Sequence, residues 1–195
     1  MNRYSFFVVF VLSSIMFSSC SHRQKIQEQI TKMNSQSVAI DLYNMQRVDP
    51  LMSECYDSID EEFSFVVFTD SNQCSGCSLN KMSSWNTLLK LEKLTNGKVK
   101  FNFIVEPRSG DELSVLQTAK NIDFVHPLYI DTRHVFRNAN AFIPKDPLFH
   151  IFLLDKDQKI VLIGNPLLNK KIEKLAIKVI EDRIGQIDLH YDEDL

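Results

Sequence analysis

The run FSFVVFTD, at residues 63–70, limits the possible folds of this chain more than any other segment. Apolar side chains occupy most of its positions without polar alternation, which is typical of a strand buried on both faces, as in a parallel sheet. Cys74 and Cys77 follow after a short polar turn. Apolar residues then recur three and four positions apart, which predicts a helix over about 75–94. We therefore expect the cysteine pair at the junction of a central strand and a helix.

The rest of the chain alternates strand and helix patterns and ends with a hairpin. FHIFLLD and KIVLIG flank KDQ, which predicts antiparallel strands at 149–155 and 159–164. An amphipathic helix at 165–184 follows, with Asn165 or Asn169 as its cap. Parallel units followed by a hairpin predict an α/β layer fold with a mixed sheet. The other expected elements are strands at 37–42, 99–107 and 127–131, helices at 109–122 and 132–141, a short helix near 52–59, and a helix cap at Gly97.

The first twenty residues have the pattern of an export signal. MNRYSFFVVFVLSSIMFSSC has a basic residue, a short apolar stretch and small residues before Cys20, which indicates a signal peptide at 1–19. The apolar stretch is too short to span a bilayer comfortably. FSSC resembles a bacterial lipobox in which Phe17 replaces the usual aliphatic residue, so we favour cleavage before Cys20 and its acylation. The alternative is an ordinary cleaved signal in which Cys20 has no role.

The length of 195 residues suits one domain with a tail. We expect a lipid-anchored tether at 20–36, a domain at 37–184 and an acidic tail at 185–195. The net charge is −3 and the chain has no run of Lys or Arg, so nothing points to a nucleic-acid partner. An exported chain enters an envelope in which disulfides persist.

The expected helix start favours thiol chemistry. Unpaired N–H groups and a partial positive charge at a helix N-terminus stabilise a thiolate, so Cys74 is the expected nucleophile. Cys77 lies one turn further on, where we expect it to be close enough to close a disulfide and protected enough to serve as the resolving thiol, and Gly76 is expected to permit the tight geometry between them. Two alternatives remain open, a structural disulfide or a metal site completed by Cys55 and a histidine. Cys55 is otherwise a small buried residue or pairs with another chain.

These residues resemble the thioredoxin fold. The stretches FVVFTDSNQCSGCSLNKMSSW and FHIFLLDKDQKIVLIGNP are similar to exported thiol–disulfide oxidoreductases of the TlpA/ResA type, and most similar to small thioredoxin-like lipoproteins of Bacteroidales. The resemblance covers about residues 37–182. It implies a three-layer α/β fold with a mixed central sheet and helices on both faces. It also implies that Cys74 attacks a substrate disulfide and Cys77 resolves it, without a cofactor or a metal.

One departure from the family concerns substrate docking. The family's cis-proline lies against the disulfide and helps to align substrate, but Phe149 occupies that position and Pro147 stands two residues earlier. We expect Pro147, Phe149 and His150 to be the substrate-contacting positions. The thiolate pair with the imidazole of His150 would also suit Cu(I), so a copper-handling protein is an alternative. The simpler expectation is that His150 faces solvent or an interface.

Other departures concern acid–base chemistry. Gln73 replaces the usual aromatic residue before the first cysteine, and Phe68 stands where thioredoxin has a buried acid. Asp70 is therefore expected to be a turn or cap residue rather than a proton carrier. Ser71 lies three residues before the first cysteine, as the threonine of peroxiredoxins does. Val67 replaces the upstream proline of those enzymes, so peroxidase chemistry is a minor alternative.

The resemblance also implies partners and a location. The expected substrates are cysteine-containing envelope proteins, a further redox partner must recharge the pair, and the lipid at Cys20 holds the chain on a membrane. SHRQK, after Cys20, lacks the acidic run associated with surface export in Bacteroidales lipoproteins, so we expect a periplasm-facing protein. The functional alternative is a non-catalytic binding lipoprotein in which the disulfide is structural.

Overall fold

A computed structural model of the chain describes residues 22–49 and 60–187. Several expected features lie outside these residues: the signal peptide 1–19, Cys20, Cys55, the short helix near 52–59, and most of the acidic tail 185–195.

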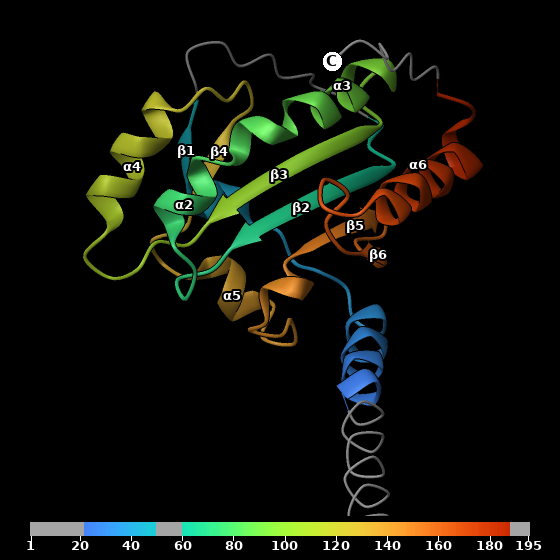
Figure 1. Cartoon of the computed structure of the whole chain (residues 1–195), viewed down its shortest axis with the longest axis horizontal. Helices are drawn as coiled ribbons and strands as arrows, with labels where there is room; N and C mark the ends of the chain where they lie inside the picture. Colours follow the sequence, from blue (N-terminus) through green and yellow to red (C-terminus); the bar gives the residue numbers. More distant parts are fainter. Residues whose placement is uncertain (1–21, 50–59, 188–195) are drawn as a thin grey trace, which may run out of the picture.

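The strands of the described residues form one mixed sheet in the order β1-β4-β3-β2-β5-β6 (Figure 1). β2, β3 and β4 run parallel, whereas β1, β5 and β6 each pair antiparallel with a neighbour. Parallel strands need crossover helices and antiparallel strands can share a hairpin, so the predicted α/β fold with a mixed sheet is confirmed. The strands are β1 (Gln46–Val48), β2 (Phe63–Thr69), β3 (Val99–Val105), β4 (Leu128–Ile130), β5 (Ile151–Asp155) and β6 (Ile160–Ile163).

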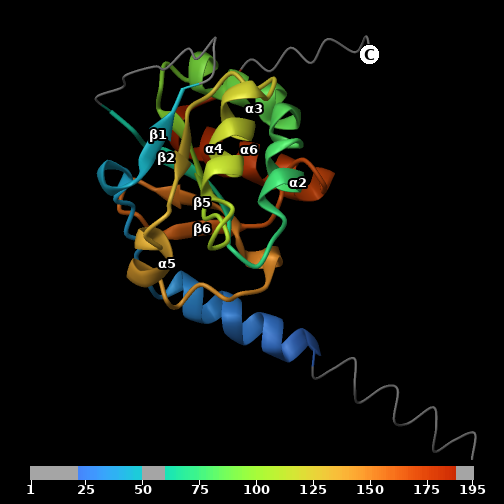
Figure 2. The same cartoon turned by 90° about the vertical axis from the view of Figure 1, so that its left-hand side faces the viewer.

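Helices cover both faces of this sheet, as predicted. In Figure 2, α2 and α3 lie toward the right of the strands, and α5 lies at the lower left, where its Phe136 packs in a separate cluster from the residues of α3. The α-helices are α2 (Ser75–Leu79), α3 (Asn86–Leu94), α4 (Glu112–Asn121), α5 (Val135–Ala139) and α6 (Lys170–Ile184), and the 3₁₀ helices are η1 (Leu42–Asn44), η2 (Met82–Trp85) and η3 (Pro147–Phe149). Asn169, one of the two predicted caps, accepts a hydrogen bond from the N–H of Lys171 at the start of α6.

β2 lies in the interior of the sheet between β3 and β5, and all seven of its residues are buried. Phe63, Phe65 and Val67 pack into one hydrophobic cluster, together with residues of α3, α4 and α6. The alternate residues Val66 and Phe68 pack into a second cluster with α5 and η3. Successive side chains of a strand point to opposite faces, so the uninterrupted apolar run builds both layers of the core.

The helix predicted over 75–94 is broken into α2, η2 and α3. Leu79, Met82 and Trp85 are all buried, at 0%, 3% and 4% exposure. Their spacing of three residues matches the 3₁₀ helix, in which side chains at i and i+3 eclipse, whereas an α-helix would rotate them progressively off one face. The tighter turn at η2 therefore keeps all three side chains in the core.

The edge strand lies later in the chain than predicted. Segment 37–42 makes an isolated β-bridge to the turn of the terminal hairpin, and β1 takes the edge position beside β4. The N–H and C=O of Ala39 bond the side chain of Asn140 instead, each at 2.8 Å. The alternating apolar residues of this segment therefore reflect the burial of Val38 rather than sheet pairing.

The segment before the domain is helical over residues 22–34. Ile26 and Ile30 pack against the second cluster, and Met33 is fully buried within it. Residues spaced three and four apart share one face of a helix, so the C-terminal part of this helix is held against the domain.

Candidate functional site

Cys74 and Cys77 form a disulfide at the start of α2, just beyond the C-terminal end of β2. Their Cα atoms are 5.2 Å apart, as expected for residues one helical turn apart. Both residues are exposed. Another molecule's sulfur can therefore approach the pair without a rearrangement of the core.

Hydrogen bonding distinguishes the two sulfurs. Cys74 is the N-cap of α2, and its Sγ accepts a hydrogen bond from the N–H of Cys77 at 3.2 Å. A donor aimed at this sulfur favours its thiolate form once the disulfide is reduced. The local geometry thus supports Cys74 as the leading thiol.

One expectation about this turn is wrong, because Cys77 is exposed rather than protected. Gly76 is not required by the backbone, since its φ is negative and a Cβ there would meet no atom within 4 Å. The helical turn alone brings the two cysteines together.

The surroundings of the pair settle the fold. The cysteines link a central strand to a helix, and that strand is parallel to β3 and antiparallel to β5. The β5–β6 hairpin and α6 then complete the unit in the order that the resemblance implied. The chain has a thioredoxin-like fold. In this thioredoxin-like domain, β4 and β1 extend the sheet beyond β3.

Comparisons with known proteins give solved structures of low similarity alone. No family model matches the chain, and no curated protein matches it. The solved structures that match include a candidate protein disulfide isomerase from Bacteroides thetaiotaomicron, with 21% identity over 65% of this chain and 76% of that one, and a TM-score of 0.44. A thioredoxin-like protein in its oxidised form has 18% identity over 73% of this chain and 99% of that one, and a TM-score of 0.43. An uncharacterised thioredoxin-like protein from Porphyromonas gingivalis has 18% identity over 62% and 74%, and a TM-score of 0.37.

The loop that leads into Cys74 is held by side chains from several elements. Asp70 is buried, and its Oδ1 accepts the N–H of Asn72 at 3.1 Å, which makes it the turn residue that was predicted. Glu106 Oε1 accepts the hydroxyl of Ser71 at 2.6 Å. Arg108 donates to the carbonyl oxygens of Ser71 and Asn72, at 3.1 and 3.3 Å. The position of the nucleophile is therefore fixed by its surroundings.

Arg137 supplies a partly buried positive charge behind this loop. Its Nη2 lies 3.0 Å from Asp70 Oδ2, and its guanidinium lies over the Phe68 ring, 4.9 Å from the centroid. Phe68 has no proton to exchange and forms a face for the cation.

His150 is almost fully buried, with 1% exposure, so the expectation that it faces solvent is wrong. Its Nε2 lies 2.8 Å from the carbonyl oxygen of Pro144, and its Nδ1 lies 2.9 Å from Gln73 Nε2. Nε2 also lies 3.4 Å from Arg137 Nη2, but the carbonyl oxygen is closer and can only accept, so Nε2 carries the proton and Nδ1 accepts from the Gln73 amide. Burial lowers the pKa of His150 and keeps it neutral, although the bond to Pro144 opposes this shift. Both nitrogens are occupied, which disfavours His150 as a copper ligand.

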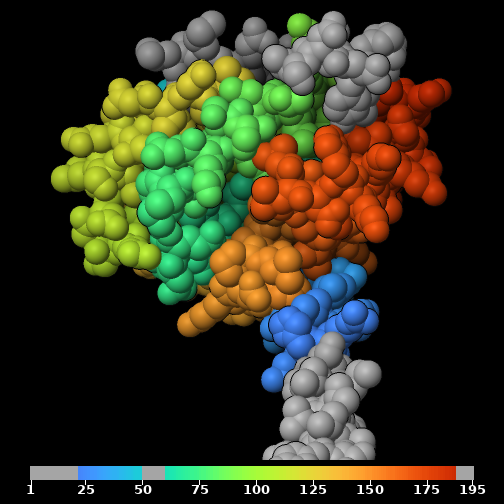
Figure 3. All heavy atoms as spheres, in the orientation of Figure 1, coloured from blue at the N-terminus to red at the C-terminus, as the bar shows by residue number. Residues whose placement is uncertain are grey.

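The segment around η3 adjoins the start of α2 on the molecular surface (Figure 3). Pro147 begins η3 and is exposed, and the neighbouring Leu148 is 54% exposed. Phe149 is 1% exposed and packs in the second cluster, so it offers almost no surface to a substrate. The described residues contain no cis peptide bond.

The sequence interpretation missed Glu106 and Arg137. Each of the parallel strands β2, β3 and β4 is followed at once by a buried acid, namely Asp70, Glu106 or Asp131, with 1%, 3% and 0% exposure. That repeated position was a usable signal, because the carboxyl ends of parallel strands meet at one edge of a sheet. No comparable signal marks Arg137, which reaches Asp70 from α5.

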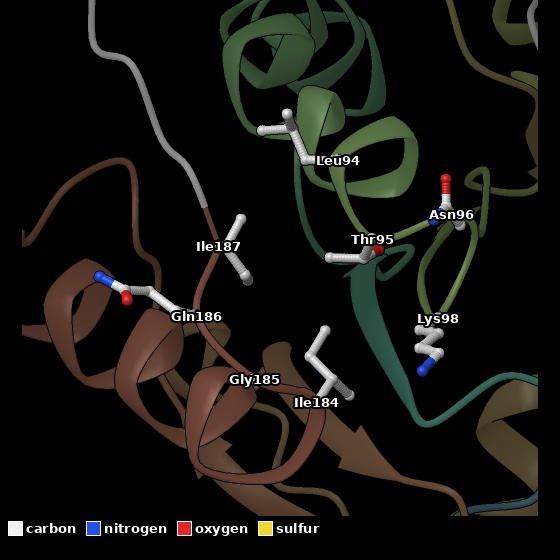
Figure 4. A pocket seen from close by; sticks show the side chains of 8 residues that line it. All are labelled: Leu94, Thr95, Asn96, Lys98, Ile184, Gly185, Gln186 and Ile187. Carbon is white, nitrogen blue, oxygen red and sulfur yellow. The ribbon is translucent and has the colours of Figure 1, made fainter.

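Two further features of the described residues lie away from the cysteine pair or bear on a metal site. Within 22–49 and 60–187, no three His, Cys, Asp or Glu side chains are grouped so that they could hold a metal ion. A shallow pocket lies between the end of α3 and the segment after α6, where Lys98 is the lone titratable residue (Figure 4). Lys98 accepts a hydrogen bond from Phe63 at the N-terminal end of β2, so this pocket lies at the opposite end of that strand from the cysteines.

No helix within residues 22–49 and 60–187 combines the length and the apolar character needed to cross a bilayer.

Proposed function

We propose that this chain is an exported, lipid-anchored thiol–disulfide oxidoreductase that exchanges disulfides with cysteine-containing envelope proteins. One observation carries the proposal: an exposed Cys74–Cys77 disulfide at a helix start, with Cys74 Sγ accepting the N–H of Cys77. The signal-like residues 1–19 and the lipobox-like FSSC support export and acylation at Cys20.

The proposed exchange consists of two successive nucleophilic displacements at sulfur. In the reduced protein, the Cys74 thiolate attacks one sulfur of a substrate disulfide, the substrate S–S bond breaks, and a mixed disulfide forms as the other substrate sulfur leaves as a thiolate. The Cys77 thiol then loses its proton to solvent and attacks Cys74 Sγ, which releases the second substrate thiolate. Both released thiolates take up protons at neutral pH. Two electrons have then moved from the cysteine pair to the substrate, and an external dithiol must reduce Cys74–Cys77 for another cycle.

The same pair could run in reverse and oxidise a substrate dithiol. The reduction potential of the Cys74–Cys77 couple decides the direction: a value near about −270 mV indicates a reductant, and one near about −120 mV indicates an oxidant. A value far below both would indicate a structural bond and support the binding lipoprotein instead.

Trapping tests the exchange directly. In the reduced Cys77→Ser variant, Cys74 should form a mixed disulfide with substrate that cannot be resolved, visible as a covalent adduct on non-reducing gels. The matched Cys74→Ser variant retains Cys77, which is exposed as Cys74 is, but should trap far less. Alkylation of the reduced protein should give a Cys74 pKa below the usual thiol value of about 8.5. Equal trapping by both variants, with a Cys74 no more reactive than a free thiol, would refute catalysis.

The anchor has its own test. Cys20→Ala should move the protein from the membrane fraction to the soluble fraction of the cell envelope, because the acyl chains are lost. The Cys74→Ser variant serves as the control and should stay with the membranes. If Cys20→Ala stays there as well, lipid anchoring is wrong.

A further inference from the structure

Gln73 immediately precedes the attacking cysteine, and its side chain has a fixed orientation. Its Nε2 donates to His150 Nδ1 at 2.9 Å, since the proton of that imidazole lies on the nitrogen that faces Pro144. His150 is in turn enclosed by the Phe68 ring, 5.2 Å away between centroids. The amide therefore cannot rotate freely, and the direction of its oxygen is set by a buried residue.

The oxygen of this amide is unused. Within the described residues, the one hydrogen bond of the Gln73 side chain is the bond from Nε2 to His150, and Oε1 receives no donor. Gln73 is half-buried, and its neighbour Cys74 is exposed. A preoriented acceptor thus belongs to the residue that directly precedes the reactive Cys74.

The chemistry of the acceptor indicates what it would recognise. A polypeptide that presents a cysteine in an extended segment also presents main-chain N–H groups beside that cysteine. When the surface of the enzyme covers such an N–H group and excludes water from it, the group needs a new hydrogen-bond acceptor. An amide oxygen is neutral and accepts at any physiological pH, so it suits a peptide N–H better than a charged group.

We propose that Gln73 is a substrate-positioning residue whose Oε1, oriented by His150, accepts a hydrogen bond from a main-chain N–H beside the attacked cysteine of a polypeptide substrate. This inference rests on the proposed disulfide exchange and adds the substrate group that the site recognises. His150 acts through Gln73 and does not touch the substrate.

The test uses the reduced full-length chain and three disulfide probes. One is a short disulfide-linked cysteine peptide, the second is the same peptide with the amide nitrogens beside each cysteine methylated, and the third is 5,5′-dithiobis(2-nitrobenzoate), which has no N–H group. Rate constants are measured for the wild type, Gln73→Ala and His150→Asn. His126→Asn is the matched control, because His126 is also buried but contacts Glu92 instead of the cysteine loop.

We expect the wild type to react about three- to tenfold faster with the unmethylated peptide than with the methylated one, the effect of one neutral hydrogen bond. Gln73→Ala should remove most of that preference, and His150→Asn should reduce it. The rate with the aromatic probe reports the reactivity of the Cys74 thiol itself, so each peptide rate is divided by it, and His126→Asn should keep the preference. A general loss of structure would slow all three probes together.

The outcomes separate the two proposals. If the reduced wild type reacts with no probe faster than a free thiol does, the exchange function fails, and the inference fails with it. If it reacts well but shows no preference between the peptides, or if Gln73→Ala retains the preference, the role of Gln73 is wrong while the exchange function stands.

Discussion

Arg137 and Asp70 form an ion pair directly behind the cysteine loop, with Nη2 and Oδ2 3.0 Å apart. The Asp70 side chain is 1% exposed and that of Arg137 is 19% exposed. The pair joins α5 to the end of β2 and so connects the two layers beside the candidate site. Removal of one partner leaves a charge in a place from which water is excluded.

We predict that Arg137→Met lowers the free energy of unfolding by about 3 kcal/mol, because the buried Asp70 carboxylate loses its counter-charge. The double variant Arg137→Met/Asp70→Asn should lose less than the sum of the two single changes, since it leaves no unpaired charge. Urea unfolding followed by the fluorescence of Trp85, the one tryptophan of the chain, gives these values. Strictly additive losses would show that the pair is not coupled.

The burial of His150 predicts a dependence of stability on pH. Burial lowers its pKa in the folded state, whereas the unfolded chain binds the proton near the ordinary value of about 6.5. The unfolded state therefore binds more protons as the pH falls below about 6.5. The stability that the neutral, buried His150 contributes is fully present above that pH, and it is lost as the pH falls through the folded-state pKa of His150. The charges that face His150 are Asp70 and Asp146, which oppose the shift, and Arg137, which supports it.

We expect the wild type to lose more stability between pH 7 and pH 5 than His150→Asn, which cannot take up this proton. Denaturant midpoints at a series of pH values, at constant ionic strength, measure the difference. His126 and His134 are present in both proteins, so their effects cancel in the comparison. Parallel curves for the two proteins would contradict the prediction.

Two glycines should respond to alanine in opposite directions. The predicted cap at Gly97 is wrong by two residues, because Thr95 is the C-cap of α3; Gly97 lies in the turn that follows, with a φ of 77° and its N–H bonded to the Glu92 carbonyl at 2.7 Å. Gly97→Ala should cost about 1 kcal/mol because an L side chain rarely adopts this backbone conformation. Gly76→Ala should add about 0.5–1 kcal/mol, since alanine favours the helix and meets no neighbour there. Thermal unfolding of both variants tests the contrast, and a Gly76→Ala protein that cannot close its disulfide would contradict it.

Asn140 is fully buried and joins parts of the chain that are 101 residues apart. Its side chain bonds both backbone groups of Ala39, and its Nδ2 also donates to the Phe136 carbonyl at 2.9 Å. Asn140→Ala should cost about 1–3 kcal/mol because these buried backbone groups lose their partner. Asn121→Ala is the control, since exposed Asn121 bonds only its own helix at Gln117 and should change stability by less than about 0.5 kcal/mol. Similar losses in both variants would show that the bridge is not important.

The elements could be predicted where a segment's own pattern decides its burial. The apolar run of β2, the hairpin turn between β5 and β6, and the amphipathic pattern of α6 each required one arrangement, and the structure has all three. The placement of Cys74 and Cys77 at a strand–helix junction follows from the same local order. The broken helix at η2 and the displaced edge strand β1 were not predicted, because packing against distant strands and the Asn140 bridge decide them.

The sequence by itself determined the layered fold and the position of the cysteine pair, because strand and helix periodicities and the spacing of the cysteines are local properties of the chain. Only the tertiary structure decided which residues surround that pair. His150 contacts Gln73 across 77 positions, and Arg137 contacts Asp70 across 67. Hydrogen bonds and ion pairs of this kind depend on which loops the folded sheet brings to one edge, and no periodicity along the chain encodes that meeting.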